Sequence, residues 1–178
     1  MVKRLGEMGL VIHRSYRGAL LSESGRLVAL EVIRHHRLLE RYLHEVVGLD
    51  WDQVHAEAEV LEHHISEALE DRLDALLGHP THDPHGDPIP TRDGVLAPRA
   101  ETRLADVAPG DYRVARLSSH DAALLGALDA LGLLPGAIVA VAAPRAPGSV
   151  RLVRGGTPLT LAAETARHVF VEPVGEEA

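Results

Sequence analysis

Two runs of residues decide how the chain is interpreted: His36-Arg37-Leu38-Leu39-Glu40 and His55-Ala56-Glu57-Ala58-Glu59-Val60-Leu61-Glu62-His63. On a helix turning about 100° per residue, the two histidines of the second run and its glutamates at positions 59 and 62 fall within about 100° of circumference. Burying such a face costs free energy unless a positive group balances the charge of its carboxylates. Neutral imidazole and carboxylate oxygen suit first-row divalent transition metals. The pattern therefore predicts a metal site.

The composition limits the class of protein. The 178 residues, 46% of them hydrophobic, can form one ordinary domain or two small ones. No apolar run has the length of a membrane span and no leader is recognisable, so we expect a cytoplasmic protein with no membrane partner. Because the chain has no cysteine, disulfides and thiolate ligands are excluded. Any metal must be held by nitrogen and oxygen.

The charge is divided unevenly along the chain. The formal net charge is -8, but residues 1–20 carry Lys3, Arg4, Arg14 and Arg17 against Glu7 alone. This basic end can face phosphate, although ordinary surface charge is the alternative interpretation. Aromatic residues are too few for a single-stranded nucleic-acid platform built from stacked rings.

The first third of the chain predicts a hairpin followed by helices. Residues 10–14 and 19–21 flank a polar, basic tip, which is typical of a short β-hairpin. Ser22 is a good N-cap for a helix that Gly48 ends. Asp50 and Gln53 form a capping-box pattern, which predicts a second helix through about residue 64. A third helix is predicted from Ser66 to about Leu77, before Gly78.

The segment from His79 to Pro98 is rich in proline and has little periodicity, so we expect a linker or an ordered loop. Its three histidines, His79, His82 and His85, could bind metal weakly. We interpret them instead as surface residues between prolines.

From Glu101 the pattern changes to short strands. Asp121 can cap a short helix through Leu131. Five short strand-like runs are enough for a small closed barrel. They lie at residues 112–117, 137–141, 150–153, 158–161 and 168–172.

Two consecutive antiparallel helices joined by residues 47–49 would bring His36 and Glu40 to His55. Glu59, Glu62 and His63 could contribute to a second site nearby. A solvated helix face is the alternative, since His/Glu pairs four apart are common on surfaces. A zinc hydrolase would need His-Glu-x-x-His. That motif is absent and no nucleophile lies with an activating base, so we expect no enzyme.

The residues also resemble a known family. Residues 1–77 are similar to the metal-dependent transcriptional repressors related to the diphtheria toxin repressor and the manganese transport regulator. The resemblance is carried by residues 5–11, 22–25, 36–41, 48–50 and 54–63, with Pro84-His85-Gly86-Asp87-Pro88-Ile89-Pro90 similar to the loop before the family's last domain. Residues from about 101 resemble the SH3-like, FeoA-like barrel that ends many members.

The resemblance implies an α+β protein with four parts. They are the remnant of a winged helix with its wing hairpin (1–21), a helical metal-binding and dimerisation domain (22–78), a Pro/His-rich linker (79–100) and the FeoA-type barrel (101–174). By the same resemblance, His36, Glu40 and His55 match the ancillary metal site. Glu59, Glu62 and His63 match the primary or second site, and His36 also matches a ligand of the binuclear manganese site. Ser119, His120 and Asp121 do not reproduce the ligands that the barrel of iron-type members can lend.

The resemblance also implies a function. We expect a homodimer that binds double-stranded operator DNA when loaded with Mn²⁺ or Fe²⁺, for which Zn²⁺, Co²⁺ or Ni²⁺ can substitute. The glutamate at position 59, where iron-type members tend to have cysteine, points toward manganese. Lys3, Arg4, Arg14 and Arg17 would contact phosphate. Because the chain begins inside the equivalent of the recognition helix, we expect either a start at the wrong methionine or a reduced paralogue that senses metal, dimerises and acts through protein contacts.

Overall fold

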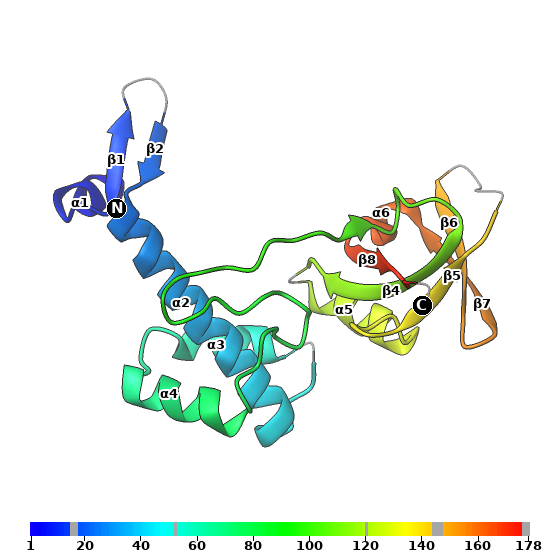
Figure 1. Ribbon diagram of the computed structural model, residues 1–178, viewed down its shortest axis with the longest axis horizontal. Coiled ribbons are helices and arrows are strands. Elements are labelled where there is room, and N and C mark those ends of the chain that lie inside the picture. The colour runs from blue at the N-terminus through cyan, green and yellow to red at the C-terminus, as the bar shows by residue number, and fades with distance from the viewer. Residues whose placement is uncertain (15–17, 52, 120, 144–147, 176–178) are drawn as a thin grey trace.

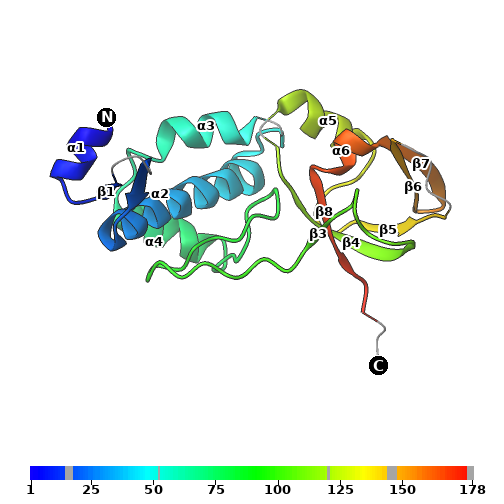
Figure 2. The ribbon, with the colours of Figure 1, turned by 90° about the horizontal axis from the view of Figure 1, so that it is seen from above.

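The structure is a computed structural model that describes residues 1–14, 18–51, 53–119, 121–143 and 148–175. An N-terminal helix and hairpin, a helical unit and a β-sheet unit follow one another along the chain (Figure 1). A segment without helix or strand, residues 77–101, runs from the helical unit to the sheet unit (Figures 1 and 2).

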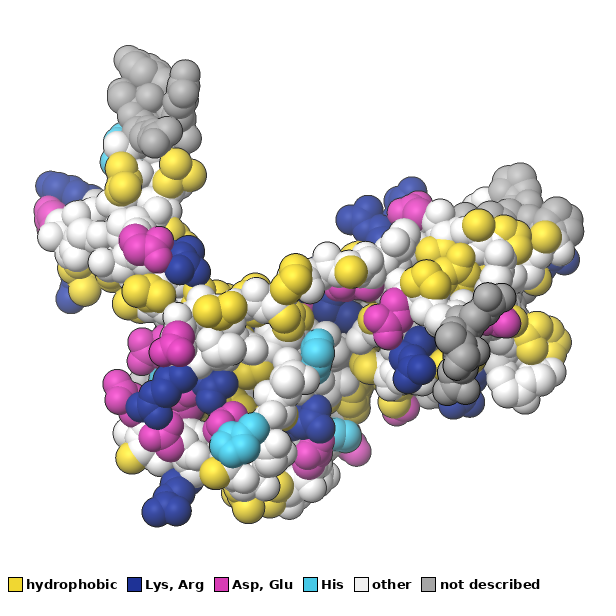
Figure 3. Space-filling view, in the orientation of Figure 1, with side chains coloured by type: hydrophobic (Ala, Val, Ile, Leu, Met, Phe, Trp, Pro, Cys, Tyr) yellow, Lys and Arg dark blue, Asp and Glu magenta, His cyan; other side chains and the backbone are white. Residues whose placement is uncertain are grey.

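The N-terminal part contains the predicted hairpin. Helix α1 (Val2–Glu7) is followed by strands β1 (Val11–Arg14) and β2 (Gly18–Leu21), which pair antiparallel. In residues 1–13 and 18–21 no side chain is buried. This part therefore has no core of its own among the described residues, and Figure 3 shows hydrophobic side chains on its surface.

The hairpin is joined to the next helix by close backbone contacts. Ser22 caps helix α2 (Glu23–Tyr42): its Oγ accepts from the Gly25 N–H at 3.0 Å and donates to the Gly9 carbonyl at 2.6 Å. Gly25 lies so close to Leu10 that a Cβ at position 25 would be 2.0 Å from the Leu10 carbonyl oxygen. Only glycine fits there without a shift of the backbone.

The helical unit has a small apolar core. Helix α2 continues into the π-helical turn η1 (Leu43–Val47), and Gly48 ends it in the left-handed conformation with φ of 80°, as predicted. Helix α4 (Glu67–Leu76) begins after the predicted cap Ser66. The buried residues that pack together between these helices and α3 are Leu39, Leu43, Val54, Ala58 and Leu73.

The second predicted helix is shorter than expected. Helix α3 covers only Val54–Leu61, and Gln53 occupies its N-cap position without a side-chain hydrogen bond. The predicted capping box is therefore wrong: the Gln53 N–H bonds to the Asp50 carbonyl in a turn instead. At the other end Glu62 is the C-cap, so Glu62 and His63 lie beyond the last helical turn.

The proline-rich segment is an ordered loop. The Asp83 Oδ1 accepts from the His85 and Asp87 N–H groups at 2.8 and 2.9 Å, and Ile89 is buried. Arg34 and Arg37 of α2 donate to the carbonyls of Pro90 and Pro88. These contacts hold residues 81–90 against α2.

The C-terminal unit is a six-stranded antiparallel sheet in the order β3-β8-β4-β5-β6-β7. All five predicted strands are present, and Asp121 caps helix α5 as predicted. The elements are β3 (Thr102–Arg103), β4 (Gly110–Leu117), α5 (Ala122–Ala130), β5 (Ile138–Val141), β6 (Ser149–Arg154), β7 (Thr157–Ala162), α6 (Ala163–Ala166) and β8 (Val169–Pro173).

Contacts between the two larger units include one aromatic side chain and one loop. Trp51, from the connection before α3, belongs to the buried cluster of the sheet unit, and its Nε1 donates to the Pro84 carbonyl at 3.2 Å. The Leu117 N–H of β4 donates to the His85 carbonyl at 2.9 Å. A search of the described residues finds no helix with the length and hydrophobicity of a membrane span.

Gly25→Ala should lower the free energy of unfolding by about 1–3 kcal/mol, because the new methyl group meets a backbone carbonyl. The matched control is Gly6→Ala, whose Cβ would be 3.7 Å from the Val11 carbonyl oxygen in ordinary contact. Since alanine favours a helix over glycine, this control should be neutral or slightly stabilising. Urea denaturation followed by circular dichroism measures both. Wild-type stability in Gly25→Ala would contradict the close contact.

Candidate metal centre

The predicted ligands His36, Glu40 and His55 meet in one group. His36 and Glu40 lie four residues apart on α2, and His55 comes from the first turn of α3, which packs against α2. His36 Nε2, Glu40 Oε1 and His55 Nδ1 are each 3.0 Å from the other two. Ligands bonded at about 2.1 Å and at right angles around one ion are about 3.0 Å apart. The three atoms thus have the spacing of neighbours in a coordination shell.

Glu62 lies beside this group, on the opposite side of the His36 ring. Its Oε2 lies 2.6 Å from His36 Nδ1, so the His36 ring bridges two carboxylates. His63 is 63% exposed and approaches only the other Glu62 oxygen, at 3.2 Å. Glu59 lies on the exposed face of α3. The structure brings three of the six predicted ligands together, places Glu62 and His63 next to each other on the other side of the His36 ring, and leaves Glu59 outside.

His85 and Asp83 lie in the same centre, which corrects the interpretation of His85 as a surface histidine. His79 and His82 are exposed as expected, but His85 is only 6% exposed. Its Nδ1 lies 3.6 Å from Glu40 Oε2. Glu40, Asp83 and His85 form a second group whose potential ligand atoms lie within 4.8 Å of one another. The sequence signal was the Asp-Pro-His-Gly turn, where proline and glycine fix the backbone.

Glu40 is the member that the two groups share. Its carboxylate is 2% exposed, with Oε1 toward His36 and His55 and Oε2 toward His85. Burial raises the pKa of Glu40, but hydrogen bonds and charges from His36 and His85 outweigh it and hold this pKa well below its usual value. A carboxylate in this position can bridge two ions or serve one.

The surrounding groups show what the Glu40 charge does. The pKa of His36 is raised: burial lowers it, but hydrogen bonds and charges from Glu40 and Glu62 outweigh the effect of burial. For His85, burial is likewise outweighed by Glu40 and Asp83, so its pKa is raised. Burial, together with the charge of Glu40, raises the pKa of Asp83 to about 7. The group therefore holds protons tightly, and a divalent cation would replace them.

The chemistry of the donors fits a divalent metal. The His85 Nε2 is buried and has no hydrogen-bond partner among the described residues. Imidazole nitrogen with carboxylate oxygen and no thiolate suits Mn²⁺ and Fe²⁺. Both groups line a cavity of about 250 Å³ that Arg37, Asp87, Arg99, Arg116, Leu117, Ser118 and Ser119 complete. The sheet unit thus contributes Ser119 to the wall, whereas Asp121 caps α5 and His120 lies outside the described residues.

The residues predicted to contact phosphate are distant in sequence from this centre. Lys3 and Arg4 are exposed on α1. Arg14 ends β1, and Arg17 lies outside the described residues.

The chain is similar to known families and proteins over most of its length. Residues 22–91 match the model of the iron dependent repressor, metal binding and dimerisation domain, and residues 102–173 match the FeoA domain. The iron-dependent repressor IdeR of Mycobacterium leprae is 36% identical over 186 residues, 97% of this chain and 81% of that protein. IdeR of Mycobacterium tuberculosis is 38% identical with the same coverage.

Solved structures of metal-dependent repressors are also similar to this chain over nearly its whole length. A manganese-dependent transcriptional repressor in complex with manganese has a TM-score of 0.88 and 38% identity, covering 97% of this chain and 82% of that chain. The manganese regulator SloR has a TM-score of 0.79 and 30% identity, covering 97% and 80%. The ancestry shared with these repressors extends over almost the whole chain, through both the helical and the sheet units. The chain therefore belongs to the iron-dependent repressor family of metal-dependent transcriptional repressors, as its sequence predicts.

Proposed function

We propose that this chain is a Mn²⁺- or Fe²⁺-dependent transcriptional regulator that binds its ion at the Glu40 carboxylate. The observation that carries the proposal is that both oxygens of one buried carboxylate face imidazoles, from α2, α3 and the loop. Relatives named as iron-dependent and manganese-dependent repressors support the choice of these ions. The same donors can accept Zn²⁺, Co²⁺ or Ni²⁺.

We propose that the ligands act in groups around Glu40. His36, Glu40 and His55 form one site, which Glu62 supports from the other side of the His36 ring, and Glu40 with Asp83 and His85 forms a second. Glu59, Glu62 and His63 remain a proposed third group at the exposed end of α3. The Glu62 carboxylate already contacts a member of each group, with Oε2 2.6 Å from His36 Nδ1 and Oε1 3.2 Å from His63 Nε2.

The output of the sensor is proposed to be a metal-dependent dimer on operator DNA in the cytoplasm. The matching family model is described as a dimerisation domain, and α3 and α4 expose the apolar side chains Val60, Leu61, Leu69 and Leu76. Lys3, Arg4, Arg14 and Arg17 would contact phosphates, which positions a protein without specifying sequence. The alternative output is a metal-sensing dimer that acts through protein contacts.

Isothermal titration with Mn²⁺ should separate the two groups that share Glu40. His55→Ala should weaken binding in the first group and His85→Ala in the second, each by about tenfold or more, while Glu40→Gln weakens both. His36→Ala and Glu62→Ala should behave like His55→Ala. His79→Ala is the control, since His79 is exposed and pairs with Asp74 instead. Equal, weak binding by wild type and all variants would rule out the proposal.

The affinity for Mn²⁺ should rise with pH through and beyond the ordinary pKa of histidine. Metal binding needs neutral imidazoles and ionised carboxylates, and the pKa values of His36 and His85 are raised while that of Asp83 is about 7. Protons therefore compete with the ion most strongly below pH 7. Titrations between pH 6 and 8 should show the affinity falling steadily toward pH 6. An affinity independent of pH over this range would show that these groups do not take part.

A gel shift on the promoter of the chain's own operon, with and without Mn²⁺, tests the output. A repressor should shift the DNA only with metal, and Lys3→Ala or Arg4→Ala should each weaken binding and lower the salt dependence by about one counterion. Arg72→Ala, at an exposed position on α4, is the matched control. Metal binding and dimerisation without any shift would favour the alternative output.

A further inference from the structure

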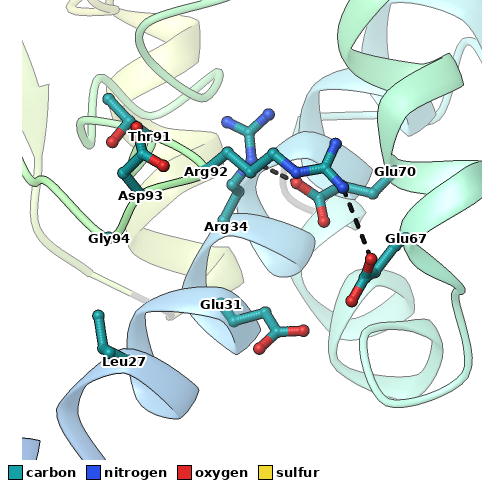
Figure 4. Close-up of a pocket in the computed structure, with 9 residues that line it drawn as sticks. All are labelled: Leu27, Glu31, Arg34, Glu67, Glu70, Thr91, Arg92, Asp93 and Gly94. Carbon is teal, nitrogen blue, oxygen red and sulfur yellow. Dashed lines mark hydrogen bonds and ion pairs between the residues drawn. The ribbon is translucent and has the colours of Figure 1, made fainter. Parts of the chain in front are cut away.

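A buried polar cluster outside the proposed ligands joins α2 to α4. Arg34, His35 and Glu70 are only 8%, 7% and 4% exposed. Arg34 Nε donates to Glu70 Oε1, and a second nitrogen of Arg34 donates to the Pro90 carbonyl at 2.9 Å. Figure 4 shows Arg34 of α2 reaching Glu70 of α4 at the wall of a pocket. Because buried ion pairs often add little net stability over apolar packing, this cluster suggests a role in fixing positions.

The His35 ring lies between two oxygen atoms from different segments. Its Nε2 is 3.0 Å from Glu70 Oε2, and its Nδ1 is 3.2 Å from the main-chain oxygen of Glu62. A carbonyl oxygen can only accept, so His35 Nδ1 donates to it. Glu70 is held in turn by Arg34, which also pairs with Asp74 of α4 at 3.2 Å.

Two consecutive residues of α2 therefore hold Glu62 at two points. His36 Nδ1 faces the Glu62 carboxylate at 2.6 Å, while His35 bonds to the Glu62 carbonyl. Neighbouring helix residues point about 100° apart, so one ring reaches the metal group and the other reaches toward α4. Glu62 is the C-cap of α3, where carbonyls lack partners within the helix. An external donor is needed there to fix the backbone.

We propose that His35 is a positioning residue for the Glu62 carboxylate. By holding the main chain of Glu62 against α2, it keeps the carboxylate on His36 Nδ1, where the carboxylate orients the ring whose Nε2 faces Glu40 and His55. Glu70 and Arg34 keep the His35 ring in place, so α4 is tied to the geometry of the metal group. The inference rests on the proposed metal binding, because the position of Glu62 affects the ion only through the His36 ring.

A double-mutant cycle tests the role. His35→Phe keeps a ring of similar shape and removes both hydrogen bonds. Because groups that orient metal ligands commonly matter by about 10- to 100-fold in affinity, His35→Phe should weaken Mn²⁺ binding to that extent. In a Glu62→Gln background the same substitution should have almost no further effect, since the carboxylate that it positions is already lost. Mn²⁺ binding is followed by electron paramagnetic resonance up to millimolar metal.

Two controls separate positioning from general destabilisation. His64→Phe makes the same substitution at an exposed position in the turn after α3, and it should leave the affinity unchanged. If His35→Phe does not fold, Glu70→Gln replaces it in the cycle. Glu70→Gln keeps the size of the side chain but weakens its hold on His35, so a smaller loss should appear with Glu62 present and disappear in Glu62→Gln.

The outcomes distinguish this inference from the proposed function. If the wild type binds Mn²⁺ and His35→Phe loses the same affinity with Glu62 as with Gln at position 62, the positioning role is overturned and the metal site stands. Unchanged affinity in His35→Phe would have the same meaning. Wild-type protein that binds no Mn²⁺ would overturn both proposals.

Discussion

The burial of one carboxylate, that of Glu40, determines how the segments around it are arranged. Removing a carboxylate from water costs several kcal/mol unless charges and hydrogen bonds replace its hydration. Glu40 is 2% exposed, and imidazoles replace the water: His36 from the same helix, His55 from α3 and His85 from the loop. Because these groups come from three segments, the carboxylate can be buried only when all three converge. The apolar core of the helical unit is small, so this convergence is a large part of its organisation.

The same buried carboxylate explains why the centre is suited to binding a metal ion. Protons are the competing partners of the cluster, because the pKa values of His36 and His85 are raised and that of Asp83 is raised to about 7. A proton joins two atoms at a time, whereas a divalent ion can bind donors from all three segments at once. The ion can shift the arrangement only by the difference between its affinities for two states. A group that holds its donors about 3.0 Å apart already lies close to the bound geometry.

Local signals predicted most of the fold, because neighbours in the sequence determine caps, turns and alternation. The caps Ser22, Ser66 and Asp121 and the stop at Gly48 are where the sequence placed them. His36, Glu40 and His55 were predictable because helical spacing and a short connection bring them together. Asp83 and His85 were not, since their positions depend on contacts of an irregular loop with α2 and β4, far away in the sequence. Glu62 lies just beyond the end of α3 at Leu61, and its side chain contacts His36 as well as the predicted neighbour His63.

The loop that carries Asp83 and His85 also fixes the sheet unit. The His85 carbonyl accepts from the Leu117 N–H of β4, and a Cβ on Gly86 would be 2.1 Å from the Ala115 carbonyl oxygen. Such an approach between backbones leaves little freedom for one to slide past the other. A displacement of β4 must therefore move His85 relative to Glu40. By linkage, an ion that favours one position of His85 favours the matching position of the sheet unit to the same extent.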